Sequence, residues 1–158
     1  MVDLGLRCSE VVHLRLASFD WREGTITITG GKGRRVRQLP LPVVTGKAVA
    51  RYLQRGRPRT SNRRVFVRHH APFDKPLGTG AICSVISSAY ARCGLEDQFA
   101  GTHALRHGCA MRLQGSGASF KEIADLLGHQ DLDATKIYAK VDLEGLRAVA
   151  LPWPGSKQ

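Results

Sequence analysis

The clearest structural signal in the sequence is a hairpin pattern in its first quarter. Residues 25–29 alternate threonine and isoleucine with the period and the propensity of a β-strand. The segment GGKG then supplies a turn, and the strand pattern resumes over residues 36–41, where Pro40 and Pro42 end it. We therefore expect an antiparallel β-hairpin with Lys32 at its tip.

Helical periodicity dominates the rest of the chain. Its apolar spacing predicts successive helices over residues 9–16, 42–55, 81–93, 103–113, 119–128 and 142–149. A further helix, capped by Asp131 or Asp133, is expected to carry Tyr138, and VFV at residues 65–67 is expected to form a short strand. With 158 residues, the chain suits one α+β domain, mainly helical, with a small antiparallel sheet on one side.

The helix predicted over residues 119–128 has the best-defined ends. Ser119 at its start and Glu122 three positions later form a capping-box pattern, and Gly128 is placed to terminate the helix. Between these ends, the residues predicted to face a core are Ile123, Leu126 and Leu127. Thr102 is expected to cap the preceding helix.

The charge balance of the chain favours a polyanionic partner. Lys and Arg number 24 against 13 Asp and Glu, which gives a net charge of +11 and an isoelectric point near 10.2. Arg34, Arg35 and Arg37 follow Lys32 in the hairpin pattern, so we expect them to bind phosphates along a DNA backbone. A basic protein without any nucleic-acid role is the alternative that charge alone leaves open.

Cysteine and histidine spacing argues against a disulfide framework or a metal site. Four cysteines occur without a CxxC pair or a secretory signal and are expected to be reduced, mostly buried thiols: Cys8, Cys83, Cys93 and Cys109. His103 and His107 have the i, i+4 spacing of two metal ligands, but HALRH lacks the glutamate of HExxH, and Arg106 would oppose a cation. We expect neither a metal nor another cofactor.

Six scattered residues could together hold and attack one DNA phosphate. Moving a DNA strand without ATP or a metal requires a nucleophile that stores the phosphodiester bond, and fixed positive groups for the charge that gathers on phosphorus. A tyrosine hydroxyl can be the nucleophile, and two guanidiniums can hold the non-bridging oxygens bidentately, which lysine cannot do as well. The candidates are Arg7, Lys32, His103, Arg106, His129 and Tyr138, of which His103 and Arg106 share a helix face at i, i+3.

The segments that carry these residues read RCSEVVHLRL, GGKGRRVRQLPLP, GTHALRHG and LLGHQDLDATKIYAKV. In this order they resemble the catalytic domain of the tyrosine recombinases, the phage-integrase and Xer-like family, over nearly the whole chain. The resemblance implies that Tyr138 forms a 3′-phosphotyrosyl bond and that His129 donates a hydrogen bond to the phosphate. It also implies that His103 accepts or relays the tyrosine proton, that Lys32 protonates the departing 5′ oxygen, and that Glu10 buttresses the arginines.

The resemblance further implies double-stranded DNA as the partner and a homotetramer on paired DNA sites, with a monomer in solution as the other state. Residues 142–158 are either a segment exchanged between neighbours or a tail folded back on its own chain. No run approaches the roughly 18 apolar residues of a membrane span, so we expect a cytoplasmic protein, associated with the bacterial nucleoid when bound to DNA.

The N-terminus departs from the family pattern, because only six residues precede Arg7 where the family carries a further helix and a separate DNA-clamping domain. We therefore treat residues 1–158 as a single catalytic domain that is truncated at its N-terminus. Two functions follow: a site-specific recombinase acting through Tyr138, and a catalytically incomplete remnant that still binds DNA. Relaxation of DNA by a type IB topoisomerase shares the chemistry, but the context of Tyr138 is closer to that of recombinases.

Overall fold

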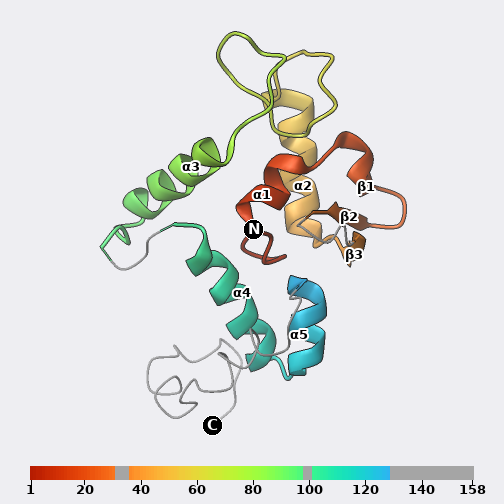
Figure 1. Ribbon diagram of the computed structural model, residues 1–158, viewed down its shortest axis with the longest axis vertical. Coiled ribbons are helices and arrows are strands. Elements are labelled where there is room, and N and C mark those ends of the chain that lie inside the picture. Colours follow the sequence, from red (N-terminus) through yellow and green to blue (C-terminus); the bar gives the residue numbers. More distant parts are fainter. Residues whose placement is uncertain (31–35, 98–100, 129–158) are drawn as a thin grey trace.

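The computed structural model describes residues 1–30, 36–97 and 101–128, in which one small sheet lies to one side of a group of helices (Figure 1). The helices are α1 (Cys8–His13), α2 (Val43–Arg51), α3 (Thr79–Arg92), α4 (His103–Gly115) and α5 (Phe120–Leu127). A 3-10 turn (Leu16–Ser18) follows α1, and a π-helical turn (Tyr52–Gly56) continues α2. The strands are β1 (Phe19–Asp20), β2 (Thr25–Thr29) and β3 (Val36–Pro40). The predicted fold class, α+β and mainly helical, is confirmed.

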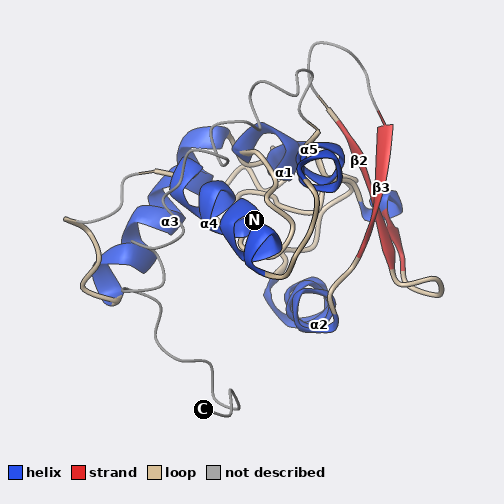
Figure 2. Cartoon of the chain, turned by 90° about the horizontal axis from the view of Figure 1, so that it is seen from below, coloured by secondary structure: helices blue, strands red, loops and turns tan. Residues whose placement is uncertain are grey.

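The sheet is antiparallel in the order β1-β2-β3, and its longer pair is the predicted hairpin. Ile26 pairs with Leu39 and Ile28 pairs with Arg37, so these four side chains lie on one face of the sheet. The three apolar ones are buried there. In Figure 2 the sheet stands at one edge of the molecule, and α1 contacts β2. Strand β1 lies in SFDW, which has no strand periodicity, so the sequence does not predict it.

Two apolar clusters hold the elements together. The larger lies between α1, the sheet and α3, and its buried residues include Leu6, Val12, Ile28 and Ile86. The smaller joins α4 to α5 through Ala110, Ile123 and Leu127. Helix α5 therefore buries the face that its sequence predicts, with Ile123 and Leu127 fully covered. This packing fixes the C-terminal end of α5 beside the start of the chain.

The helix ends follow the sequence at α5 but not at α4. The Ser119 amide donates to Glu122 Oε2 at 2.8 Å and the Ser119 hydroxyl accepts from the Glu122 amide at 3.3 Å, so the capping box is confirmed. Gly128 ends α5 with a φ of 64°. Thr102 makes no side-chain capping bond to α4, because its φ of −84° and ψ of −16° are already helical rather than extended.

Two local predictions are wrong. Residues 65–67 form no strand, because the chain pairs there only through isolated bridges at Arg64 and Val67. All four cysteines are free thiols as predicted, but only Cys109 is buried. Within the described ranges, none of the helices combines the length and the hydropathy that crossing a membrane requires.

Candidate functional site

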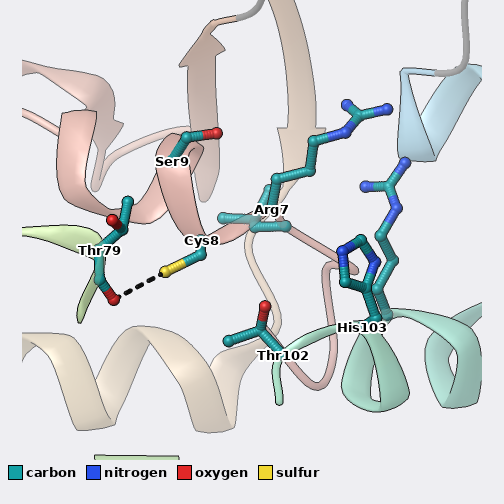
Figure 3. A pocket seen from close by; sticks show the side chains of 8 residues that line it. Arg7, Cys8, Ser9, Thr79, Thr102 and His103 are labelled. Atoms are coloured by element: carbon teal, nitrogen blue, oxygen red, sulfur yellow. Dashed lines mark hydrogen bonds between the residues drawn. The ribbon is translucent and has the colours of Figure 1, made fainter. Parts of the chain in front are cut away.

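A pocket of about 290 Å³ lies where the starts of α1, α3 and α4 come together. Figure 3 shows Arg7 and His103 extending from the starts of α1 and α4 into the same region, with Thr102 close by. The residues that line the pocket are Leu6, Arg7, Cys8, Ser9, Thr79, Thr102, His103 and Arg106. Three of the six residues predicted to handle a phosphate are therefore brought together, although 96 positions separate Arg7 from His103 in the sequence.

Arg106 is the most deeply buried of these three predicted residues, with only 7% of its surface exposed. Its Nη1 donates to the Gly5 carbonyl at 2.7 Å and its Nη2 donates to the Leu127 carbonyl at 2.8 Å. A planar guanidinium can bridge two carbonyl oxygens in this way because its donors are fixed in a fork. Arg106 thus connects α4 to the N-terminal segment and to the end of α5.

Arg7, at the start of α1, reaches the same end of α5. Its Nη1 donates to the Leu127 carbonyl at 3.4 Å, and its Nη2 donates to the Gly128 carbonyl at 3.3 Å. The Leu127 oxygen therefore accepts hydrogen bonds from both Arg7 and Arg106. A helix C-terminus carries partial negative charge, which favours cations at this position. The guanidiniums of two residues that line the pocket thus converge on one acceptor oxygen.

Glu10 lies behind Arg7 and is 3% exposed. Its Oε2 accepts from the Arg7 amide at 2.7 Å, and its Oε1 accepts from Arg7 Nη1 at 3.3 Å. Burial on its own raises the pKa of the Glu10 carboxyl, but hydrogen bonds from Arg37 and from the Arg7 amide, with the charges of both arginines, bring the pKa below its ordinary value. Glu10 is therefore an ionised carboxylate inside the protein, rather than a solvated helix residue.

Arg37, predicted to bind phosphates, lies against Glu10. Its side chain is 15% exposed, and its Nη1 and Nη2 donate to the two Glu10 oxygens at 2.9 and 3.0 Å. The pairing register of β2 and β3 explains why the Arg37 side chain points toward the protein interior. Arg37 is paired with the buried Ile28, and residues opposite each other in antiparallel strands face the same side of the sheet.

The guanidinium of Arg37 also packs against Gly128. A Cβ atom added at Gly128 would lie 2.6 Å from Arg37 Nη1, and Gly128 has a φ of +64°. We expect Gly128→Ala to lower the free energy of unfolding by about 1 kcal/mol for the left-handed backbone, and by about 1–3 kcal/mol more for the overlap with a side chain that Glu10 holds in place.

Gly94→Ala is the matched control for that substitution. Gly94 also has a φ of +64°, but nothing lies within 4 Å of a Cβ added there. Urea denaturation of both variants measures their losses of unfolding free energy. The loss in Gly94→Ala gives the cost of the left-handed backbone, and the additional loss in Gly128→Ala gives the cost of the overlap with Arg37. Equal losses of stability would show that Arg37 moves aside without cost.

The remaining predicted site residues lie outside the described part of the chain. They are Lys32, Arg34, Arg35, His129 and Tyr138. The described residues that flank them are nevertheless at the site. A Cβ added at Gly30 would lie 3.2 Å from the Glu10 side chain, and Gly128 contacts Arg7 and Arg37. Among the residues that the structure describes, no three His, Cys, Asp or Glu side chains are grouped to hold a metal ion.

Comparison with known proteins places this site in a defined context. Residues 1–144 match the Phage integrase family. The integrase/recombinase y4rA of Sinorhizobium fredii is 47% identical over 155 residues, which are 98% of this chain and 37% of that protein. The integrase/recombinase y4gC of the same organism is 35% identical, with 97% of this chain and 79% of that protein covered. The tyrosine recombinase XerD of Lacticaseibacillus casei is 35% identical, over 94% of this chain and 50% of that protein.

Solved structures give the same result. The crystal structure of XerA recombinase matches with a TM-score of 0.80 and 26% identity, covering 94% of this chain and 53% of that chain. The chain thus spans little more than a third of y4rA and about half of the Xer proteins.

Proposed function

The chain belongs to the phage integrase family of tyrosine recombinases, and on that premise we propose that it cleaves and rejoins DNA strands through a 3′-phosphotyrosyl intermediate at Tyr138. The substrate of this proposal is double-stranded DNA at specific sites, which fits the net charge of +11. We further propose that the working form is a tetramer on paired sites. Sedimentation of the protein with and without its DNA tests that assembly.

The observation that carries the proposal is the convergence of Arg7 and Arg106 on one oxygen. Their Nη atoms lie 3.4 and 2.8 Å from the Leu127 carbonyl, and both residues line the pocket with His103. A phosphodiester under attack accumulates negative charge on its non-bridging oxygens, and preorganised donors stabilise that charge without reorganising during the reaction. Two converging guanidiniums with an adjacent imidazole supply such donors.

The proposed reaction balances without a cofactor. The Tyr138 hydroxyl attacks phosphorus, so a tyrosyl oxygen–phosphorus bond forms and the bond to the 5′ oxygen breaks. His103 takes the proton of the tyrosine, and Lys32 supplies a proton to the departing 5′ oxygen. His129 donates a hydrogen bond to the phosphate. The free 5′ hydroxyl of a partner strand then reverses these steps and releases the tyrosine.

Covalent capture tests the proposal. The protein is incubated with a pool of nicked double-stranded oligonucleotides of randomised sequence, and adducts that survive denaturant are collected and sequenced. We expect the wild-type protein to form such an adduct and Tyr138→Phe to form none. Tyr90→Phe is the matched control, because it removes a tyrosine hydroxyl on α3 that donates to the Gly101 carbonyl at 3.4 Å and does not line the pocket.

Two results would contradict the proposal. An adduct that persists in Tyr138→Phe would place the nucleophile elsewhere. A wild-type protein that binds DNA in a salt-sensitive way, but never forms an adduct, would be the catalytically incomplete remnant.

A further inference from the structure

Arg37 joins three elements that carry the site. It belongs to β3, its two terminal nitrogens bind Glu10 of α1, and its guanidinium lies against Gly128 at the end of α5. Its side chain is 15% exposed, whereas that of Arg7 is 42% exposed. The Nε of Arg37 is buried and has no acceptor among the described residues. Arg37 therefore faces the protein interior, and Arg7 faces the pocket.

The two arginines share the Glu10 carboxylate unequally. Arg37 makes a bidentate pair with both oxygens at 2.9 and 3.0 Å, while the Arg7 side chain makes one longer bond of 3.3 Å to Oε1. Bidentate charge-assisted pairs are the stronger and the more directional ones. The position of the carboxylate is therefore set mainly by Arg37.

The charges lead to the same conclusion. The Glu10 carboxylate can neutralise only one of the two neighbouring guanidiniums. Its contact with Arg37 is shorter than its contact with Arg7, so the charge of Arg7 is the one that remains uncompensated. Without Arg37, both Glu10 oxygens would be available to the Arg7 guanidinium, because Arg7 already contacts Oε1. Such a pair would turn Arg7 away from the pocket and neutralise the charge that a phosphate needs.

We propose that Arg37 is a positioning residue for strand cleavage. It pairs with the Glu10 carboxylate, so that the Arg7 guanidinium stays directed at the scissile phosphate and keeps its positive charge uncompensated. This inference rests on the proposed function of the pocket. It gives Arg37 a role through Glu10 rather than a contact with DNA, and it connects the strand that follows Lys32 in the sequence to the catalytic arginine.

A double-mutant cycle tests the inference. We expect Arg37→Gln to slow adduct formation at saturating DNA by about 100-fold, the scale of loss when a reacting group is misplaced by about 1 Å. In a Glu10→Gln background, where no carboxylate can capture Arg7, the same substitution should change the rate by less than about threefold. Arg37→Lys keeps a charge without the fork and should recover part of the rate.

The DNA dissociation constant separates this role from a phosphate contact. In the Glu10→Gln background, where no carboxylate can capture Arg7, we expect Arg37→Gln to leave the dissociation constant and its salt dependence unchanged. Loss of a phosphate contact would instead weaken binding and reduce the salt slope by about one. Arg22→Gln is the matched control, because Arg22 is an exposed arginine in the turn between β1 and β2. This substitution also removes one positive charge, from a turn that joins two strands of the same sheet, and should not slow adduct formation.

Guanidinium NMR signals of Arg7 provide a readout without DNA. They should shift in Arg37→Gln and return toward their wild-type positions when Glu10→Gln is added. Additive effects of the two substitutions on the rate, or unchanged Arg7 signals in Arg37→Gln, would overturn the inference. A wild-type protein that forms no adduct would instead refute the proposed function, and the Arg7 signals would still decide whether Arg37 controls Arg7 through Glu10.

Discussion

Arg106→Met is expected to abolish adduct formation and to lower the free energy of unfolding by about 3 kcal/mol. Methionine fills a similar volume but donates no hydrogen bond. The Gly5 and Leu127 carbonyls, which Arg106 binds at 2.7 and 2.8 Å, would each lose a charged donor in a buried setting. An unsatisfied buried acceptor, as at Gly5, costs about 1–3 kcal/mol. The Leu127 oxygen loses its shorter bond as well and keeps only the longer one from Arg7.

Urea denaturation at neutral pH measures this loss, and the covalent-capture assay measures the activity. Arg112→Met is the control on the same helix, because Arg112 is exposed and its guanidinium donates to the Val2 carbonyl at the molecular surface. That variant should lose less than about 1 kcal/mol. Arg106→Lys should fall between the two in stability, because an ammonium lacks the fork that bridges two carbonyls.

The outcome separates two roles of Arg106. If Arg106→Met were as stable as the wild-type protein, the two carbonyl bonds would not hold α5 in place. If Arg106→Lys kept wild-type stability but formed no adduct, the guanidinium would be needed only for binding the phosphate and not for holding α5 in place.

Glu10→Ala is expected to lower the free energy of unfolding by about 3 kcal/mol, because it leaves Arg37 as an unpaired and nearly buried cation. The four hydrogen bonds that Glu10 accepts from Arg7 and Arg37 would be lost together. Glu23→Ala is the control, because Glu23 is an exposed carboxylate in the turn before β2. It should change stability by less than about 0.5 kcal/mol.

The contribution of Glu10 depends on pH with a definite sign. Its pKa is lowered in the folded protein from the ordinary value of 4.5, so the unfolded chain binds a proton first as the pH falls. The stability that ionised Glu10 supplies is therefore complete above pH 4.5 and is lost as the pH falls through the folded-state pKa. The difference in stability between the wild-type protein and Glu10→Gln should shrink below pH 4.5. A difference that is constant from neutral to acidic pH would contradict this assignment.

The sequence predicts those parts of the fold and site that depend on short-range patterns. The hairpin of β2 and β3 follows from the alternation of threonine and isoleucine in β2, the GGKG turn and the prolines that end β3. The capping box of α5 follows from Ser119 and Glu122. The shared helix face of His103 and Arg106 follows from helical geometry. Each of these features is decided by residues within one or two turns of each other.

The features that the sequence does not predict depend on long-range contacts. The spacing of α2 places Val43 and Val44 on an apolar face, yet they are 69% and 79% exposed because no described element covers that part of the helix. The bonds from Arg106 join residues 101 and 21 positions apart, and no local pattern anticipates them. Arg37 resembles a DNA-facing arginine until the strand register is known.

Helix α5 has a consequence for the dynamics of the site. It is eight residues long, and its C-terminal carbonyls are the point at which Arg7 and Arg106 meet. A helix this short is not stable alone in water, so its order depends on packing against α4 and on those two arginines. Local opening of α5 would therefore dismantle the arrangement of both guanidiniums while the sheet and α1 remain folded. The fraction of molecules in which both guanidiniums are held in place therefore depends on the equilibrium between folded and locally opened α5. Amide hydrogen exchange in α5 measures the free energy of that opening.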